Sequence, residues 1–206
     1  MMSFISDRTL RRCVIVFGSL AALSFGAAMV VFPSGTYNPT MKMLSTLGRT
    51  VLAGEKWPLC HHLFVIGMAA SALASASSFL VCRELVTGIR RNVLYCSAIV
   101  NFIGLLVIAA IPENVSIFYH NVGCYLAAGG GCAGLIVLNG KAAGRWWTYI
   151  LLLLFSFFCI AVALHAFKVI PFAPAVPTMQ KLVILSFAAW IIRIRQTGKN
   201  GIMPPC

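Results

Sequence analysis

Long apolar runs separated by short polar segments dominate this chain. Six runs stand out, at residues 13–32, 59–81, 93–111, 122–138, 147–167 and 179–192. A helix needs roughly 20 mostly apolar residues to cross the hydrocarbon layer of a bilayer. The last run is the shortest, and Lys181 near its start can extend its charged end toward the headgroups. Because the runs are continuous rather than alternating, they predict membrane-spanning helices and not the strands of a barrel.

Composition supports the same fold class. The chain is 60% hydrophobic and only 10% charged, whereas soluble domains have about a quarter of their residues charged. Too little polar surface remains to cover a water-soluble globule. We therefore expect an all-α integral membrane protein, a bundle of six transmembrane helices that forms one domain over residues 1–206.

The charge distribution predicts the orientation of this bundle. The formal net charge is +12, and most basic residues fall on one side of an up-and-down bundle: Arg8, Arg11, Arg12, Arg83, Arg90, Arg91, Lys141, Arg145, Arg193, Arg195 and Lys199. By the positive-inside rule both termini are expected in the cytoplasm, with the protein in the plasma (inner) membrane. Membrane lipids are the expected partners. Nucleic-acid binding is not expected, because it needs a basic face on a soluble surface.

Polar residues gather at the opposite, external side. The connection 33–58 is the longest external loop and carries Ser45 and Arg49. All the histidines fall at this depth: His61 and His62 open the second run, His120 opens the fourth beside Asn121, and His165 ends the fifth. Glu113 and Gln180 lie in the adjoining loops. Ionisable groups at membrane depth are costly and are therefore candidates for function.

Three kinds of chemistry fit this polar layer. Zinc would take His120, His165, Glu113 and one of His61 and His62, since neighbouring helical residues differ by about 100° in direction. A metal-free hydrolase would use Ser45 as nucleophile and His120 as base, with Glu113 orienting the imidazole. A binding site would hold a phosphate or carboxylate headgroup with Arg49, the histidines and loop amides. Structural roles are also open, because histidine suits an interface and Glu113 can pair with Arg49 to close the loop over the bundle.

The fourth run is rich in small residues. Gly123, Ala127 and Gly131 form one row at helical spacing. Small residues let a neighbouring helix approach closely in lipid. We expect this helix to pack on the second run, which has its own small face in "MAASALASASS". Alternatively, a lipid chain or another copy of the chain in a homo-oligomer fills the groove.

Three short motifs carry a resemblance to a family. The segments "YNPTMKMLSTLGRT", "PENVSIFYHN" and "PTMQKL" resemble an uncharacterised bacterial and archaeal family of six-helix membrane proteins, a domain of unknown function distantly similar to the DRAM and Sfk-type six-span proteins. The resemblance spans most of the chain and implies the same six-span topology. It also implies an external site with Asn38, Ser45, Gly48, His120 and Gln180, but no reaction. Arg49 and the His61–His62 pair depart from the family pattern.

The sequence thus favours a six-span plasma-membrane protein whose outer-leaflet polar cavity binds a lipid or small amphiphile. The candidate ligand-binding residues are Asn38, Ser45, Arg49, Asn121 and Gln180. One alternative is a membrane-embedded lipid hydrolase, with His120, Ser45 and Glu113 as catalytic residues and zinc on His61, His62, His120 and His165. Another alternative is a structural or assembly subunit.

Overall fold

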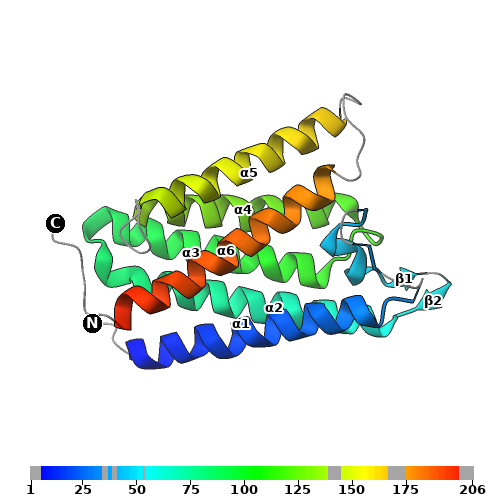
Figure 1. Ribbon diagram of the computed structural model, residues 1–206, viewed down its shortest axis with the longest axis horizontal. Coiled ribbons are helices and arrows are strands. Elements are labelled where there is room, and N and C mark those ends of the chain that lie inside the picture. Colours follow the sequence, from blue (N-terminus) through cyan, green and yellow to red (C-terminus); the bar gives the residue numbers. More distant parts are fainter. Residues whose placement is uncertain are drawn as a thin grey trace.

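Six long helices make up most of the molecule. The structure is a computed structural model and describes residues 6–33, 37–38, 41–52, 54–138, 145–166 and 175–199. The helices run up and down along the long axis (Figure 1): α1 (Asp7–Val30), α2 (Leu59–Val81), α3 (Gly88–Ala110), α4 (Ile117–Leu138), α5 (Arg145–Ala166) and α6 (Ala175–Lys199). The all-α fold class predicted from the apolar runs is confirmed in this coarse form.

The two ends of the bundle differ in structure. At one end, called the loop end, lie the 3₁₀-helix η1 (Leu44–Gly48), the turn between α3 and α4, and a small hairpin of β1 (Val51–Leu52) and β2 (Glu55–Lys56). At the other, called the terminal end, lie the start of α1, the end of α6 and the 3₁₀-helix η2 (Cys82–Leu85). Figure 1 shows the loop end on the right and the terminal end on the left.

The length and apolar composition of its helices identify the chain as a membrane protein. In the described part of the chain, four helical segments are long and apolar enough to cross a bilayer: Asp7–Val30, Leu59–Leu85, Gly88–Ala110 and Ile117–Leu138. α5 contributes a shorter apolar stretch, Tyr149–Ile160. Many large apolar side chains on these helices remain exposed on the protein surface, such as Leu23, Ile99 and Leu153. Exposed apolar faces of this extent are expected where lipid, and not water, surrounds the helices.

All the helices except α2 start earlier than their predicted apolar runs. α1 begins at Asp7, where Ser6 caps the helix by accepting a hydrogen bond from the Thr9 backbone N–H at 3.2 Å. α6 begins at Ala175 and includes Pro177 in its first turn, although the last run was predicted to begin at 179. A proline in the first turn costs no intrahelical hydrogen bond, because the N–H groups there have no helical partner in any case.

α4 packs principally on α3, and not on α2 as the small-residue faces suggested. Gly104 of α3 lies against the backbone of Ala127 and Gly123, so close that a Cβ at this position would overlap them. Gly130 of α4 in turn lies against the backbone of Asn101, where a Cβ would come within 2.5 Å of the amide nitrogen. The two helices therefore touch backbone to backbone, which only glycine allows.

A polar side chain sits within this contact. Asn101 of α3 is buried, accepts a hydrogen bond from Ser75 of α2 at 2.6 Å and donates one to the carbonyl of Ala127 in α4 at 2.6 Å. Buried amides are costly in lipid unless they are satisfied. Asn101 thus links three helices inside the bundle.

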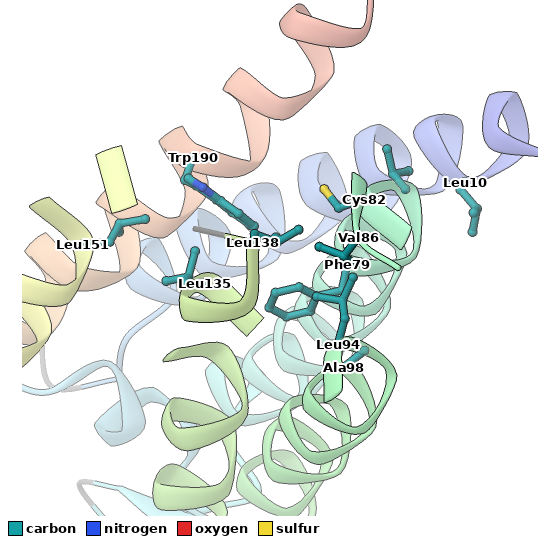
Figure 2. Packing of buried hydrophobic residues seen from close by; sticks show 11 residues of the cluster. Leu10, Phe79, Cys82, Val86, Leu94, Ala98, Leu135, Leu138, Leu151 and Trp190 are labelled. Carbon is teal, nitrogen blue, oxygen red and sulfur yellow. The ribbon is translucent and has the colours of Figure 1, made fainter. Parts of the chain in front are cut away.

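Two buried apolar clusters fill the bundle. The terminal-end cluster takes residues from all six helices, including Leu10, Phe79, Leu94, Leu151 and Trp190 (Figure 2). The loop-end cluster takes its buried residues from the first four helices, η1 and the segment between α1 and η1, such as Phe32, Leu47 and Phe64. Among described residues, α5 and α6 therefore join the apolar core at the terminal end, and α6 meets the loop end through polar contacts.

Candidate functional site

The candidate site is the polar layer at the loop end, formed by η1, the β-hairpin, the first turns of α2 and α4, and the α3–α4 turn. Its centre is Glu113, whose side chain is 19% exposed. Oε1 accepts a hydrogen bond from Nε of Arg49 at 2.7 Å, and Oε2 accepts one from the hydroxyl of Ser45 at 2.9 Å. The pairing of Arg49 with Glu113, one of the expectations from sequence, is confirmed. One carboxylate thus holds both ends of η1 against the bundle.

A second polar link lies beside the first. The Asn114 side chain accepts a hydrogen bond from the Thr50 backbone N–H at 3.2 Å, and its amide donates to the Thr50 hydroxyl at 3.0 Å. Sequence analysis did not anticipate this pair. The signal for it was weak, because an amide next to a carboxylate does not reveal which backbone group of a distant loop it will meet.

The two buried histidines both bind carbonyls at helix ends. Nδ1 of His61 donates to the carbonyl of Gly48, the last residue of η1, at 2.7 Å. Nδ1 of His120 donates to the carbonyl of Ile111, which caps α3, at 2.9 Å. Helix-end carbonyls have no partner within their own helix. Because a carbonyl can only accept, Nδ1 of each ring carries a proton.

Three other predicted site residues, His62, Asn38 and Asn121, are more exposed. His62 is exposed while His61 is buried, as expected for neighbouring positions on a helix. Asn38 and Asn121 are also exposed. His165 lies in the last turn of α5, but its side chain is outside the described part.

The described contacts bear on the two catalytic hypotheses. Within the described residues, no three His, Cys, Asp or Glu side chains gather closely enough to hold a metal ion, so zinc binding through His165 stays a prediction. Ser45 donates to Glu113, whereas His120 binds Ile111. The structure thus joins the proposed nucleophile directly to the carboxylate, and the imidazole belongs to a separate contact.

α6 is tied to the start of η1. The Leu44 N–H donates to the side-chain oxygen of Gln180 at 2.9 Å, and the ammonium of Lys181 donates to the carbonyl of Lys42 at 2.6 Å. Tyr37 donates to the same carbonyl at 3.0 Å and to the Met43 carbonyl at 2.9 Å. Burial, with a smaller effect from Glu113, raises the pKa of Tyr37, so its phenol stays neutral and can donate.

The loop end has more positive than negative charge. Its described cations are Lys42, Arg49, Lys56 and Lys181, and its carboxylates are Glu55 and Glu113. Glu113 is bound to Arg49 through Nε alone, and the Arg49 side chain is 44% exposed. A guanidinium has five N–H donors. Its terminal nitrogens therefore remain able to bind an anion while Glu113 holds the rest of the side chain in place.

No known protein family, curated protein or solved structure matches this chain in sequence or fold. The interpretation of the site therefore depends on its own geometry.

Proposed function

We propose that this chain is a six-span plasma-membrane protein, with both termini in the cytoplasm, that binds an amphiphile with an anionic headgroup at its loop end. The loop end would then face the outer leaflet. Membership of the uncharacterised six-helix membrane family suggested by the sequence motifs would imply the same topology. The excess of basic residues at the terminal end supports the orientation.

The observation that carries the proposal is that contacts within the protein occupy only part of the Arg49 guanidinium. Its Nε is bound by Glu113, so the side chain has a fixed direction, yet 44% of it is exposed. A positioned guanidinium binds phosphate or carboxylate oxygens in pairs and loses little conformational freedom when it does so. The side chains of Ser45, Glu113 and Gln180 already form hydrogen bonds within the protein. Their role in this proposal is to position η1 and Arg49, and Arg49 makes the contact with the ligand.

The apolar surroundings suit the tail of such a ligand. The loop end also exposes large apolar and aromatic side chains, among them Trp57, Val115, Ile117 and Phe118. Aromatic residues of this kind favour the boundary between headgroups and acyl chains. A ligand with a charged headgroup and an apolar tail therefore matches both the Arg49 guanidinium and the exposed apolar side chains.

Binding agrees with the described contacts better than catalysis does. A serine hydrolase needs its base within hydrogen-bond reach of the nucleophile. Here the Ser45 hydroxyl donates to a carboxylate that Arg49 already neutralises, and His120 binds a backbone carbonyl. These contacts favour the lipid-binding function over the hydrolase alternative.

The test is lipid retention by the full chain purified in detergent, measured by mass spectrometry for the wild type, Arg49→Gln and Lys56→Gln. Lys56→Gln removes a charge from the same end, at an exposed hairpin position. We expect a wild-type preference for anionic over zwitterionic amphiphiles that Arg49→Gln lowers roughly tenfold and Lys56→Gln leaves nearly unchanged. Equal retention by all three proteins contradicts the proposal. Hydrolysis products that disappear with His120→Ala would favour the hydrolase instead.

A further inference from the structure

The terminal end of the bundle carries a separate cluster of arginines. Every basic residue of α1, η2 and α3 is an arginine, whereas three of the four described cations at the loop end are lysines. The arginines are Arg8, Arg11 and Arg12 in α1, Arg83 in η2, and Arg90 and Arg91 in α3. We call these residues the arginine cluster.

Ion pairs hold these three elements side by side. Arg83 binds Asp7 of α1 at 2.9 Å and its neighbour Glu84 at 3.2 Å, and Glu84 also binds Arg91 of α3 at 3.6 Å. Arg83 and Arg91 each donate to a backbone carbonyl as well, those of Leu80 and Val86. Arg83 and Arg91 therefore serve to join α1, η2 and α3.

The other four arginines of the cluster have no Asp or Glu partner among the described residues. The whole chain contains only four Asp and Glu residues; Asp7 and Glu84 are bound to Arg83 and Arg91, and the other two belong to the loop end. Arg8, Arg12 and Arg90 are exposed. Nη1 of Arg11 is buried and has no hydrogen-bond partner among the described residues. Positive charge thus exceeds negative charge strongly on this face.

Helix stability does not account for these positions. Arg8 and Arg90 fall in the first turns of α1 and α3. A positive side chain is unfavourable there, because the helix dipole is positive at the same end. An outside anion would compensate both charges, and it would also offer acceptors to Arg11 if that side chain turned outward.

We propose that the arginine cluster binds the phosphate of acidic phospholipids in the leaflet at the terminal end. Arg8, Arg12 and Arg90 make the contact, and Arg83 and Arg91 position the three elements. Arginine suits this role because its planar fork binds two phosphate oxygens at once, whereas lysine offers a single point charge. The inner leaflet is the richer in anionic lipids, which agrees with the orientation proposed above. This site is distinct from the Arg49 site at the other end of the bundle.

The competing explanation is that these arginines only set the membrane orientation. Lysine and arginine count equally in the positive-inside rule, so exchanging one for the other separates the two roles. The decisive variant is Arg8→Lys combined with Arg12→Lys and Arg90→Lys, which keeps every charge. The same three positions changed to Gln remove the charges, and Lys56→Gln serves as the control at the loop end.

The measurement is a native mass-spectrometry titration of the full chain in detergent with phosphatidylglycerol and with phosphatidylcholine. All proteins carry Arg49→Gln in addition, so that the proposed loop-end site does not contribute. We expect the arginine form to favour phosphatidylglycerol about tenfold. The lysine form should lose most of this preference, the Gln form should lose all of it, and Lys56→Gln should keep it.

Two results would overturn the proposal. Binding by the lysine form equal to that of the arginine form would show that only charge matters. Displacement of the lipid by an equal concentration of inorganic phosphate would show that the cluster prefers a free anion. The three positions are exposed, so we expect unchanged helix content and thermal unfolding. Should the triple variants fail to fold, the single changes Arg12→Lys and Arg90→Lys decide the question in the same titration.

Discussion

The guanidinium of Arg49 donates through Nε to Oε1 of Glu113 at 2.7 Å, joining residues 64 positions apart in the chain. Ser45 occupies the other oxygen of the same carboxylate. The contact holds η1 against the turn between α3 and α4, and it also fixes the direction of the side chain proposed to meet a ligand at the loop end.

Glu113→Gln should weaken the attachment of η1. The pair is partly exposed on the arginine side, so we expect a coupling energy of about 1 kcal/mol, well below that of a fully buried pair. A double-mutant cycle with Arg49→Gln and Glu113→Gln, followed by thermal unfolding in detergent, measures it. Additive effects of the two changes would show that the contact contributes nothing to stability.

Neighbouring glycines of α4 should differ sharply in their tolerance of alanine. At Gly130 a Cβ would press on the backbone of Asn101, whereas at Gly129 it would meet nothing within 4 Å. Gly130→Ala should therefore cost about 1–3 kcal/mol of stability because the backbone of α3 must move away. Gly129→Ala should be neutral or slightly stabilising, since alanine is the better helix former. Similar unfolding temperatures for the two variants would contradict the close α3–α4 contact.

Asn101→Leu should destabilise the bundle. It removes the hydrogen bonds to Ser75 and to the Ala127 carbonyl, and hydrogen bonds between helices in membranes contribute about 0.6–2 kcal/mol each. Asn121→Leu is the matched control, because Asn121 is exposed. Unfolding in a denaturing detergent titration compares the two. A loss with Asn121→Leu as large as that with Asn101→Leu would argue against the three-helix link.

Gln180→Leu should loosen the start of η1 and leave the rest of the bundle intact. The substitution removes the acceptor of the Leu44 N–H, and a buried donor without a partner costs about 1–3 kcal/mol. Hydrogen exchange of the Leu44 amide should accelerate at least tenfold, while the amides in the middle of α2 and α3 stay protected. Unchanged exchange at Leu44 would show that α6 does not hold η1.

Part of the candidate site was predictable because it depended on local rules. Adjacent positions on a helix point in different directions, which predicted that only one of His61 and His62 would be buried. The similar depth and opposite charges of Arg49 and Glu113, in a chain poor in carboxylates, made their pairing one of the structural roles that the sequence left open. The Ser45–Glu113 and Thr50–Asn114 contacts were not predictable, because each depends on how η1 and the hairpin fold over the α3–α4 turn.

The sequence alone determined the membrane class, the approximate positions of the helices and the depth of the polar layer. Each of these follows from hydrophobicity and charge over a window of neighbouring residues. Only the tertiary structure decided which helices meet. By composition the small residues of α4 suited the small face of α2, but the close backbone contacts at Gly104 and Gly130 join α4 to α3. Such choices depend on the fit of two surfaces in three dimensions, and residue spacing along one helix does not contain that information.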